Sequence, residues 1–365
     1  MSFNDEVFKL NLQQHKDCTI EGKVSWRSPS NIALVKYWGK KGNQLPANPS
    51  VSYTLKNCYT ETSVDFTYGK NSNRDLNFLF KGKENTVFKQ KIEVFLQKVT
   101  PYFPFLADIN LTINSSNSFP HSSGIASSAS AMSALALCLC SIEEQFRDSW
   151  TDADKYRKAS FISRIGSGSA CRSVYGGLVA WGEHKSLEKS SDYYGIEVKE
   201  IHEDFKTYAD TVLLIDKGQK KVSSTIGHSL MHEHPFASQR FVQAEHNLST
   251  LLSILKEGNK DDFRKIVESE ALSLHAMMMT ANPYFILFRP NTIAVIEKIW
   301  DFREQTRLDI VFTLDAGANV HILYPLTQKN AINQFVKDEL IGYCEKREYI
   351  CDEIGTGPIN LSQTS

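Results

Sequence analysis

The sequence predicts an α+β protein with two domains. Its 365 residues exceed one typical domain, and a strand-rich N-terminal region is followed by segments of helical periodicity. A new apolar strand pattern begins at Thr211, after a polar stretch that ends near Lys206. We therefore expect an N-terminal domain over residues 1–206 and a C-terminal domain over residues 207–365.

The composition excludes several classes of protein. Hydrophobic residues make up 41% and charged residues 23%, which is typical of a folded globular chain. The net charge of −1 provides no basic field for nucleic acid. We find neither a signal-peptide core nor a run of 18 apolar residues, so we expect a cytoplasmic protein without a membrane partner. Seven cysteines without C-x-x-C spacing are expected to be reduced and mostly structural.

The N-terminal region predicts strands followed by a surface helix. Short segments rich in Val, Tyr and Thr are separated by Pro, Gly and Asn, and they cover residues 23–29, 31–38, 51–55 and 62–68. Residues 86–99 then repeat apolar side chains near helical spacing with lysines between them. The apolar residues of this helix are Val87, Ile92, Val94, Phe95 and Val99.

The segment "PHSSGIASSAS", residues 120–130, is the strongest indication of anion binding. A Ser/Gly loop opens an Ala- and Leu-rich helix that must be buried, and the start of such a helix presents free N–H groups to a phosphate. Close packing of a small-residue helix is the alternative, but it does not explain the serine cluster. No G-x-x-x-x-G-K-[ST], H-R-D or D-F-G motif occurs, which excludes P-loop NTPases and protein kinases.

A second Gly/Ser segment, "SRIGSGSACRSVYGGLVAWG", spans residues 163–182 and leads into an alternating strand. It offers backbone amides, the hydroxyls of Ser167 and Ser169, and the guanidinium of Arg172, which can bind a carboxylate with two parallel hydrogen bonds. The alternative is a structural turn with a surface arginine. We expect the two Gly/Ser segments to meet in space.

The C-terminal region predicts a strand at residues 211–216, helices at residues 234–255 and 261–280, and a strand–loop–strand hairpin over residues 309–325. Asp315 follows the first hairpin strand and precedes an Ala-Gly turn, so its carboxylate would point into a cleft. By itself, an aspartate at such a position is more often a turn former.

Three histidines follow the "VSST" turn, and two of them, His228 and His232, have helical i, i+4 spacing. That spacing suits a metal, but no H-E-x-x-H motif or cysteine pair accompanies it. We expect His228, His232 and His234 to be solvated surface residues.

The motifs together resemble a known family. "PHSSGIASSAS" is similar to the P-x-x-x-G-L-x-S-S-A motif of the GHMP kinase superfamily. Within that superfamily, "NIALVKYWGK", "LPANPSVSYTL", "GSGSACRSVYGG", "VSST" and "TLDAGAN" resemble the diphosphomevalonate decarboxylases, in family order from about Asn31 to Gly357. The resemblance implies a β-rich α/β N-terminal domain that binds ATP through the phosphate loop, and a ferredoxin-like α/β sandwich as the C-terminal domain.

The resemblance also implies an activity. Such an enzyme uses ATP and Mg²⁺ to convert the small molecule (R)-5-diphosphomevalonate to isopentenyl diphosphate, ADP, phosphate and CO₂, and it is expected to be a homodimer. A decarboxylase of the 5-monophosphate and a 3-kinase that stops after phosphorylation stay open as alternatives. A non-catalytic sensor of the same fold is another alternative, although a pure binder has no need of a base.

Finally, the resemblance implies roles for individual residues. Asp315 would be the catalytic base, Lys36 would stand near the reacting centre, and Arg172 would bind the substrate carboxylate. The implied substrate-binding residues are Asn31, Tyr37, Trp38, Gly39, Lys40, Ser167, Gly168, Ser169, Ala170, Cys171, Arg172, Ser224 and Thr225. The implied ATP-binding residues are Ser122, Ser123, Gly124, Ala126, Ser127 and Ser128, with Ser128 also on Mg²⁺. A family arginine after "FKGKENT" is missing, and Lys89 or Lys91 is expected to replace it.

Overall fold

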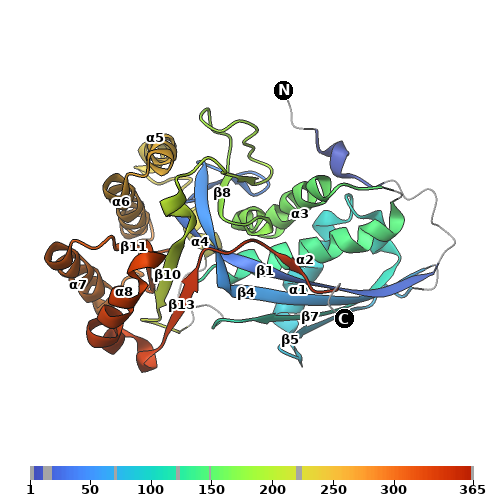
Figure 1. The fold of residues 1–365 in the computed structure, drawn as a ribbon. Helices are drawn as coiled ribbons and strands as arrows, with labels where there is room; N and C mark the ends of the chain where they lie inside the picture. The colour runs from blue at the N-terminus through green and yellow to red at the C-terminus, as the bar shows by residue number, and fades with distance from the viewer. Residues whose placement is uncertain are drawn as a thin grey trace.

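The computed structural model describes residues 4–10, 19–69, 72–120, 124–147, 149–218 and 224–362, and the side chains of Ser224 and Thr225 lie outside this set. Two separate β-sheets organise these residues (Figure 1). The larger sheet has the strand order β14-β1-β4-β7-β5-β6, with β8 and β9 attached through β4. Its strands are β1 (Ile20–Val35), β4 (Ser50–Tyr68), β5 (Leu76–Phe80), β6 (Lys83–Glu84), β7 (Ile109–Asn117), β8 (Leu178–Trp181), β9 (Ile196–Glu197) and β14 (Ile359–Asn360).

Three helices accompany the large sheet: α1 (Thr86–Val99), α2 (Ser127–Glu143) and α3 (Asp152–Gly166). Helix α1 has the predicted bounds, because the Asn85 side chain accepts the Phe88 N–H and caps it. Helix α2 packs between the sheet and α3, and its small side chains allow this close approach. Helix α3 was not predicted, because charged residues such as Lys158 and Arg164 lie on its buried face and interrupt the apolar pattern.

The second sheet is antiparallel, with the order β11-β12-β10-β13. Its strands are β10 (Tyr208–Leu213), β11 (Val311–Thr313), β12 (Val320–Pro325) and β13 (Tyr349–Glu353), and its helices are α4 (Ser224–Ser229), α5 (Ala237–Glu257), α6 (Lys260–Met279), α7 (Pro290–Thr306) and α8 (Lys329–Phe335). The predicted helices at α5 and α6 and the β11–β12 hairpin are confirmed, whereas α7 and α8 were not predicted. Together the two sheets and their helices confirm the α+β fold class. A short hairpin of two-residue strands, β2 (Lys40–Lys41) and β3 (Leu45–Pro46), stands apart from both sheets.

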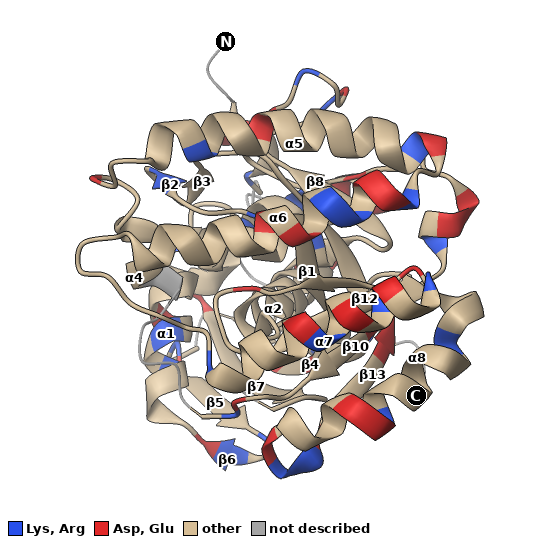
Figure 2. Cartoon of the chain, turned by 90° about the vertical axis from the view of Figure 1, so that its left-hand side faces the viewer, with Lys and Arg blue, Asp and Glu red and all other residues tan. Residues whose placement is uncertain are grey.

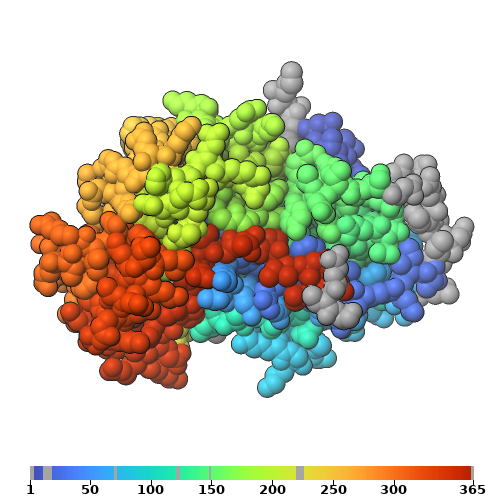
Figure 3. Space-filling view, in the orientation of Figure 1, coloured from blue at the N-terminus to red at the C-terminus, as the bar shows by residue number. Residues whose placement is uncertain are grey.

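The C-terminal segment connects the two halves of the molecule. After β13 the chain runs back over the large sheet, where β14 pairs with β1 at Trp26 and Arg27 (Figure 3). The buried Asp352 carboxylate of β13 accepts the N–H groups of residues 56–58 in β4. A boundary near residue 206 stays a prediction.

Three local expectations were wrong. Residues 23–29 and 31–38 do not form two strands, because β1 continues through Pro29 with a bulge before Asn31. In the same way, β4 joins the two segments predicted at residues 51–55 and 62–68. Strand β8 is buried on both faces instead of alternating, since it lies inside the sheet.

Charge is mixed on the outer helices. In Figure 2, Lys/Arg and Asp/Glu residues are interspersed on the visible faces of helices α5 to α8. Among the described residues, no helix has both the length and the apolarity needed to cross a membrane. Six described cysteines are free thiols, and five of them are buried, as expected of structural cysteines.

Candidate active site

A cleft of about 630 Å³ brings together segments from the whole chain. Its walls come from the end of β1, from α1, from the starts of α2 and the 168–174 turn, from α4, and from the loop after β11. The charged residues that line it are Lys36, Lys40, Lys91, Lys98, Arg172 and Asp315. Five cations therefore face one carboxylate, in a protein whose net charge is −1. This cleft is built to hold an anion.

Among the described residues, Lys36 and Asp315 form the only ion pair within this set of charged side chains. Lys36 is 1% exposed, and its Nζ lies 3.2 Å from Oδ1 of Asp315 and 2.6 Å from the carbonyl oxygen of Ala33. Burial lowers the pKa of Lys36, and the nearby Asp315 carboxylate opposes that shift. The Asp315 carboxylate is 27% exposed and lines the cleft. Of the two groups it is therefore the one that a molecule entering the cleft can reach.

Arg172 is also buried, and no carboxylate of the described residues forms an ion pair with it. Its guanidinium donates to Ser50 Oγ at 2.5 Å, Ser52 Oγ at 2.9 Å and Asn31 Oδ1 at 3.2 Å. Neutral acceptors orient the guanidinium but do not cancel its charge, so Arg172 can attract a substrate carboxylate. Asn31 itself is buried and acts on the cleft through Arg172 and Ser173.

Tyr37, Trp38 and Gly39 surround His228, which corrects the expectation of solvated surface histidines. The imidazole of His228 is buried, packs 4.3 Å from the Tyr37 ring and 4.6 Å from the Trp38 ring, and accepts the Gly39 N–H at Nδ1. Burial, followed by the charge of Lys40, lowers the pKa of His228 to about 3. His234 is also buried, with Nε2 2.9 Å from the Met277 carbonyl oxygen, and only His232 is exposed.

Two glycines make this arrangement possible. A Cβ on Gly227 would lie 2.6 Å from the Trp38 ring, so α4 packs directly on that side chain. Gly39 has φ of +95°, and a Cβ there would lie 2.8 Å from Phe241. Tyr37 lines the cleft, and its buried hydroxyl has no hydrogen-bond partner among the described residues.

Three further lysines that line the cleft form no ion pair with a described residue: Lys40, Lys91 and Lys98. Lys91 and Lys98 come from α1, together with Val87 and Val94, which are 61% and 50% exposed. These two valines do not join the core, because the cleft lies over them. Burial lowers the pKa of Lys40, and Lys98 adds to the shift. Of the two lysines expected to replace the family arginine, Lys91 lines the cleft and Lys89 does not. Lys98 also lines the cleft and was not among the predicted site residues.

The start of α2 lines both the cleft and a smaller cavity that adjoins it. Gly124 has φ of +85° and Ala126 has φ of +40°, so the chain enters α2 through two residues with left-handed backbone. Ser30 Oγ donates to the Ile125 carbonyl oxygen and fixes this loop to β1. Gly124, Ala126 and Ser128 line the cleft, whereas Ser122 and Ser123 lie outside the described residues.

The two Gly/Ser segments meet, as predicted. Ser128 Oγ lies 3.2 Å from Ser167 Oγ, and Ser167, Gly168 and Ser169 line the cleft. Gly168 is required because a Cβ there would lie 2.8 Å from the Tyr37 hydroxyl. Ala170 and Cys171 are buried beneath the cleft surface, and burial raises the pKa of the Cys171 thiol to about 12.

A smaller cavity of about 130 Å³ adjoins the cleft and shares three lining residues with it, Lys91, Ser128 and Met132. Its other walls are largely apolar and aromatic, with Phe78, Phe80 and Phe88. Such a cavity fits a flat apolar group whose charged end extends into the cleft.

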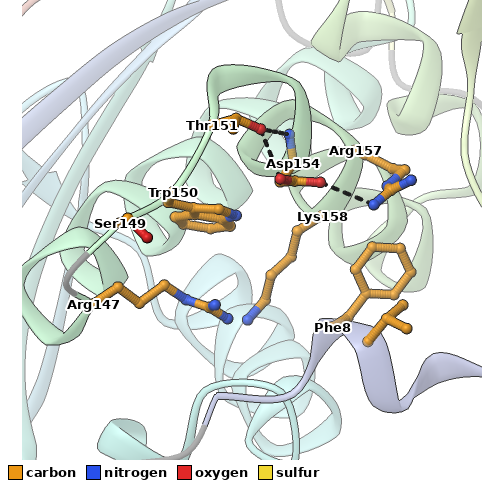
Figure 4. A pocket seen from close by; sticks show the side chains of 9 residues that line it. Phe8, Arg147, Ser149, Trp150, Thr151, Asp154, Arg157 and Lys158 are labelled. Carbon is orange, nitrogen blue, oxygen red and sulfur yellow. Dashed lines mark hydrogen bonds and ion pairs between the residues drawn. The ribbon is translucent and has the colours of Figure 1, made fainter.

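Another cavity, of about 460 Å³, lies at the turn between α2 and α3 and shares no lining residue with the other two (Figure 4). Its cations are already paired. Lys158 and Arg147 both bind the buried Glu143 carboxylate, and Arg157 binds Asp154 at 2.9 Å. We assign it no part in the chemistry of the cleft.

Some predicted residues are not placed by the structure. Thr225 and Ser224 begin α4 next to the cleft, but their side chains are not described. Among the described residues, no group of three His, Cys, Asp or Glu could hold a metal ion. The Ser128 hydroxyl is a hard oxygen donor that suits Mg²⁺, and a nucleotide-bound Mg²⁺ takes most of its ligands from phosphate and water. The role of Ser128 on Mg²⁺ stays a prediction.

Known proteins share this architecture. The decarboxylase from Gibberella zeae is 30% identical over 320 residues, which cover 83% of this chain and 81% of that protein. The solved structure of mevalonate diphosphate decarboxylase from Staphylococcus aureus has 29% identity and a TM-score of 0.80, and covers 94% of this chain and 98% of that one. A further structure, MDDEF in complex with MVAPP, AMPPCP and magnesium, has 27% identity and a TM-score of 0.78, with 94% and 99% covered.

Two family models match consecutive parts of the chain. The diphosphomevalonate decarboxylase-like N-terminal domain matches residues 28–193, and the mevalonate 5-diphosphate decarboxylase C-terminal domain matches residues 211–362. The two matches include every charged residue that lines the cleft. The chain therefore belongs to the diphosphomevalonate decarboxylase family.

Proposed function

We propose that this chain catalyses the ATP-dependent decarboxylation of (R)-5-diphosphomevalonate to isopentenyl diphosphate, ADP, phosphate and CO₂. The observation that carries the proposal is a cleft lined by five cations and one carboxylate, with that carboxylate paired to a buried lysine. The substrate is a polyanion with a carboxylate at one end and a diphosphate at the other. The cleft provides a separate cationic group for each end.

Asp315 is the proposed base. Its partly exposed carboxylate would accept the proton of the C3 hydroxyl while that oxygen attacks the γ-phosphate of ATP. Lys36, whose Nζ lies 3.2 Å from the carboxylate, would offset negative charge as it develops. Loss of the phosphorylated oxygen leaves positive charge at C3, which the departure of CO₂ relieves.

Arg172 would hold the substrate carboxylate beside C3, since the described residues that accept hydrogen bonds from its guanidinium are all neutral. At the opposite end, Lys40, Lys91 and Lys98 would hold the diphosphate, with Tyr37 and the Gly39 loop forming the wall. Two anchors at opposite ends fix C3 near Asp315, and positioning of this kind supplies much of the rate in phosphoryl transfer.

ATP would bind across the two adjoining cavities. The smaller aromatic cavity suits the adenine, and the first turn of α2 suits the phosphates, because the N-terminal end of a helix carries the positive end of the helix dipole. Mg²⁺ bound to those phosphates neutralises part of their charge. Gly124 and Ser128 then contact the phosphates, and Ser127 lies on the side of the smaller cavity.

The proposal is tested by measuring ATP-dependent CO₂ release with mevalonate 5-diphosphate and mevalonate 5-phosphate side by side. We expect a kcat/KM for the diphosphate at least about tenfold higher, because a second phosphate gains additional lysine contacts. A preference for the monophosphate would identify the sister decarboxylase. ADP release without CO₂ would identify a 3-kinase, and ligand binding without turnover would identify a sensor.

The homodimeric state and the cytoplasmic location are proposed on the family resemblance and on composition. Size-exclusion chromatography with light scattering tests the first of these.

A further inference from the structure

Glu270 of helix α6 is fully buried and reaches across to the end of strand β1. Its Oε2 accepts the backbone N–H of Lys36 at 2.8 Å. Lys36 lies just beyond the last residue of β1, so the sheet ladder no longer supplies an acceptor for this N–H. Helix α6 of the C-terminal half therefore fixes the backbone of the cleft lysine.

The carboxylate of Glu270 is itself held on both oxygens. Arg240 of α5 donates from Nη1 to Oε1 at 2.9 Å and from Nη2 to Oε2, and Asn247 donates to Oε1 at 2.6 Å. The Arg240 and Glu270 side chains are 2% and 0% exposed, so their charges compensate each other inside the protein. A carboxylate bonded on both oxygens cannot rotate away from Lys36 without losing several hydrogen bonds.

The side chain of Lys36 is fixed at its other end. Its Nζ donates to the Ala33 carbonyl oxygen at 2.6 Å and to Asp315 at 3.2 Å. A register shift between Ala33 and Val35 bends the strand at this point, which brings the carbonyl of Ala33 under the amino group. Because hydrogen bonds hold both the backbone N–H and the Nζ of Lys36, the position of its side chain relative to Asp315 is fixed.

We propose that Glu270, oriented by Arg240, is a positioning residue that holds Lys36 in register with Asp315. The proposal rests on the proposed function, because it assigns Lys36 a part in that reaction. Neither Glu270 nor Arg240 lines the cleft, so both act through the lysine.

The pair also acts on Lys36 through charge. Asp315 from the β11–β12 loop and Glu270 from α6 raise the pKa of Lys36, whereas burial and Arg172 from the 168–174 turn lower it. Glu270→Gln removes a negative charge and leaves Arg240 unpaired, so the pKa of Lys36 falls. Arg240→Gln leaves an uncompensated negative charge, so the same pKa rises.

Helix α6 offers a matched control in Glu268. This glutamate is also buried, pairs with Arg303 at 2.6 Å and accepts a strand N–H, that of Phe312 at 3.3 Å. It does not contact Lys36 or Asp315. Glu268→Gln therefore reproduces the loss of a buried Glu–Arg pair and a strand contact without touching the cleft lysine.

The test measures kcat/KM against pH for the wild type and the three variants. We expect the basic limb to move down by roughly 0.5 to 1 pH unit in Glu270→Gln and to move up in Arg240→Gln. In Glu268→Gln the basic limb of the pH profile should lie at the same pH as in the wild type, even where the substitution lowers the melting temperature. Two outcomes would overturn the proposal. One is a shift of the basic limb in the same direction in Glu270→Gln and Arg240→Gln, and the other is an equal shift in Glu268→Gln.

A second measurement needs no activity. Hydrogen exchange of the peptide that contains Lys36 should become about tenfold faster in Glu270→Gln, as expected when a hydrogen bond to a charged acceptor is weakened. In Glu268→Gln that peptide should be unchanged, while the peptide containing Phe312 exchanges faster. Unchanged exchange at Lys36 in Glu270→Gln refutes the positioning role, and a wild type without CO₂ release refutes only the proposed function.

Discussion

The Nζ atom of Lys36 and the Oδ1 atom of Asp315 lie 3.2 Å apart, although 279 positions separate the two residues in the chain. The lysine is buried and the aspartate is partly exposed to the cleft, so the cation stands behind the carboxylate. In this arrangement the Asp315 carboxylate can contact a substrate hydroxyl while the buried Lys36 balances its charge. Loss of either residue should affect chemistry more than binding.

Asp315→Asn should lower kcat by on the order of 10³ or more, because the amide keeps the shape of the side chain and cannot accept the proton. The KM for ATP should stay near the wild-type value, since the proposed site for the ATP phosphates is the start of α2. Steady-state kinetics measure both quantities. Turnover within a few-fold of the wild type would show that Asp315 is not the base.

Arg172→Lys should reduce kcat/KM by a factor that corresponds to about 2 to 4 kcal/mol. A lysine cannot reproduce the planar guanidinium that Ser50, Ser52 and Asn31 orient. The melting temperature must be recorded in parallel, because these hydrogen bonds also join β4 to the 168–174 turn. A stable variant with wild-type kcat/KM would remove Arg172 from the carboxylate subsite.

Lys98→Met should raise the KM for the diphosphate substrate by about tenfold, because the cleft loses a lysine that forms no ion pair with a described residue. Lys89→Met is the matched control on the same helix, since Lys89 does not line the cleft. Equal effects of the two substitutions would mean that Lys98 acts only through the general charge of α1.

His228 makes stability depend on pH. Its folded pKa of about 3 lies below its ordinary value of 6.5, so the unfolded chain binds the extra proton first. The contribution is fully present above pH 6.5 and falls by roughly 1 kcal/mol per pH unit as the pH drops towards 3. His228→Asn keeps an acceptor for the Gly39 N–H and should show a shallower loss in urea unfolding between pH 6.5 and 4.5. The exposed His232→Asn variant should follow the wild type, and identical slopes in all three proteins would contradict the assignment.

The entry to α2 should respond unequally to substitution. Gly124→Val places a branched side chain at φ of +85°, where it strains the backbone and blocks the approach of a phosphate. Ser128→Ala should cost roughly 2 to 3 kcal/mol in turnover, whereas Ser122→Ala and Ser123→Ala should cost under about 1 kcal/mol. The ATP KM and kcat of the four variants measure this. Small and equal effects would mean that ATP binds elsewhere.

Much of the site followed from local sequence, because each motif carries its own backbone requirement. The Gly/Ser loop before α2, the "GSGSACRS" turn and the Asp315 turn each present polar groups at the end of a regular element, and we expected the first two to meet. The Ser128 and Ser167 hydroxyls at 3.2 Å confirm that meeting. Helix α1 and the β11–β12 hairpin were predicted for the same reason, since periodicity and capping act within a few residues.

Tertiary structure decided which of these groups are buried, paired or left without a counter-ion. His228 becomes buried because Gly227 lets α4 pack on Trp38, and nothing in its own segment indicates the aromatic pair that encloses it. Glu270 looks like one more surface glutamate on an amphipathic helix until Arg240 and the end of β1 are brought to it. Propensity and periodicity depend on near neighbours in the chain, whereas burial and charge compensation depend on residues from other elements, which lie 30 positions away for Arg240 and Glu270 and 279 for Lys36 and Asp315. The sequence therefore determined the elements and the motifs, and only the folded chain determined how Lys36 is held.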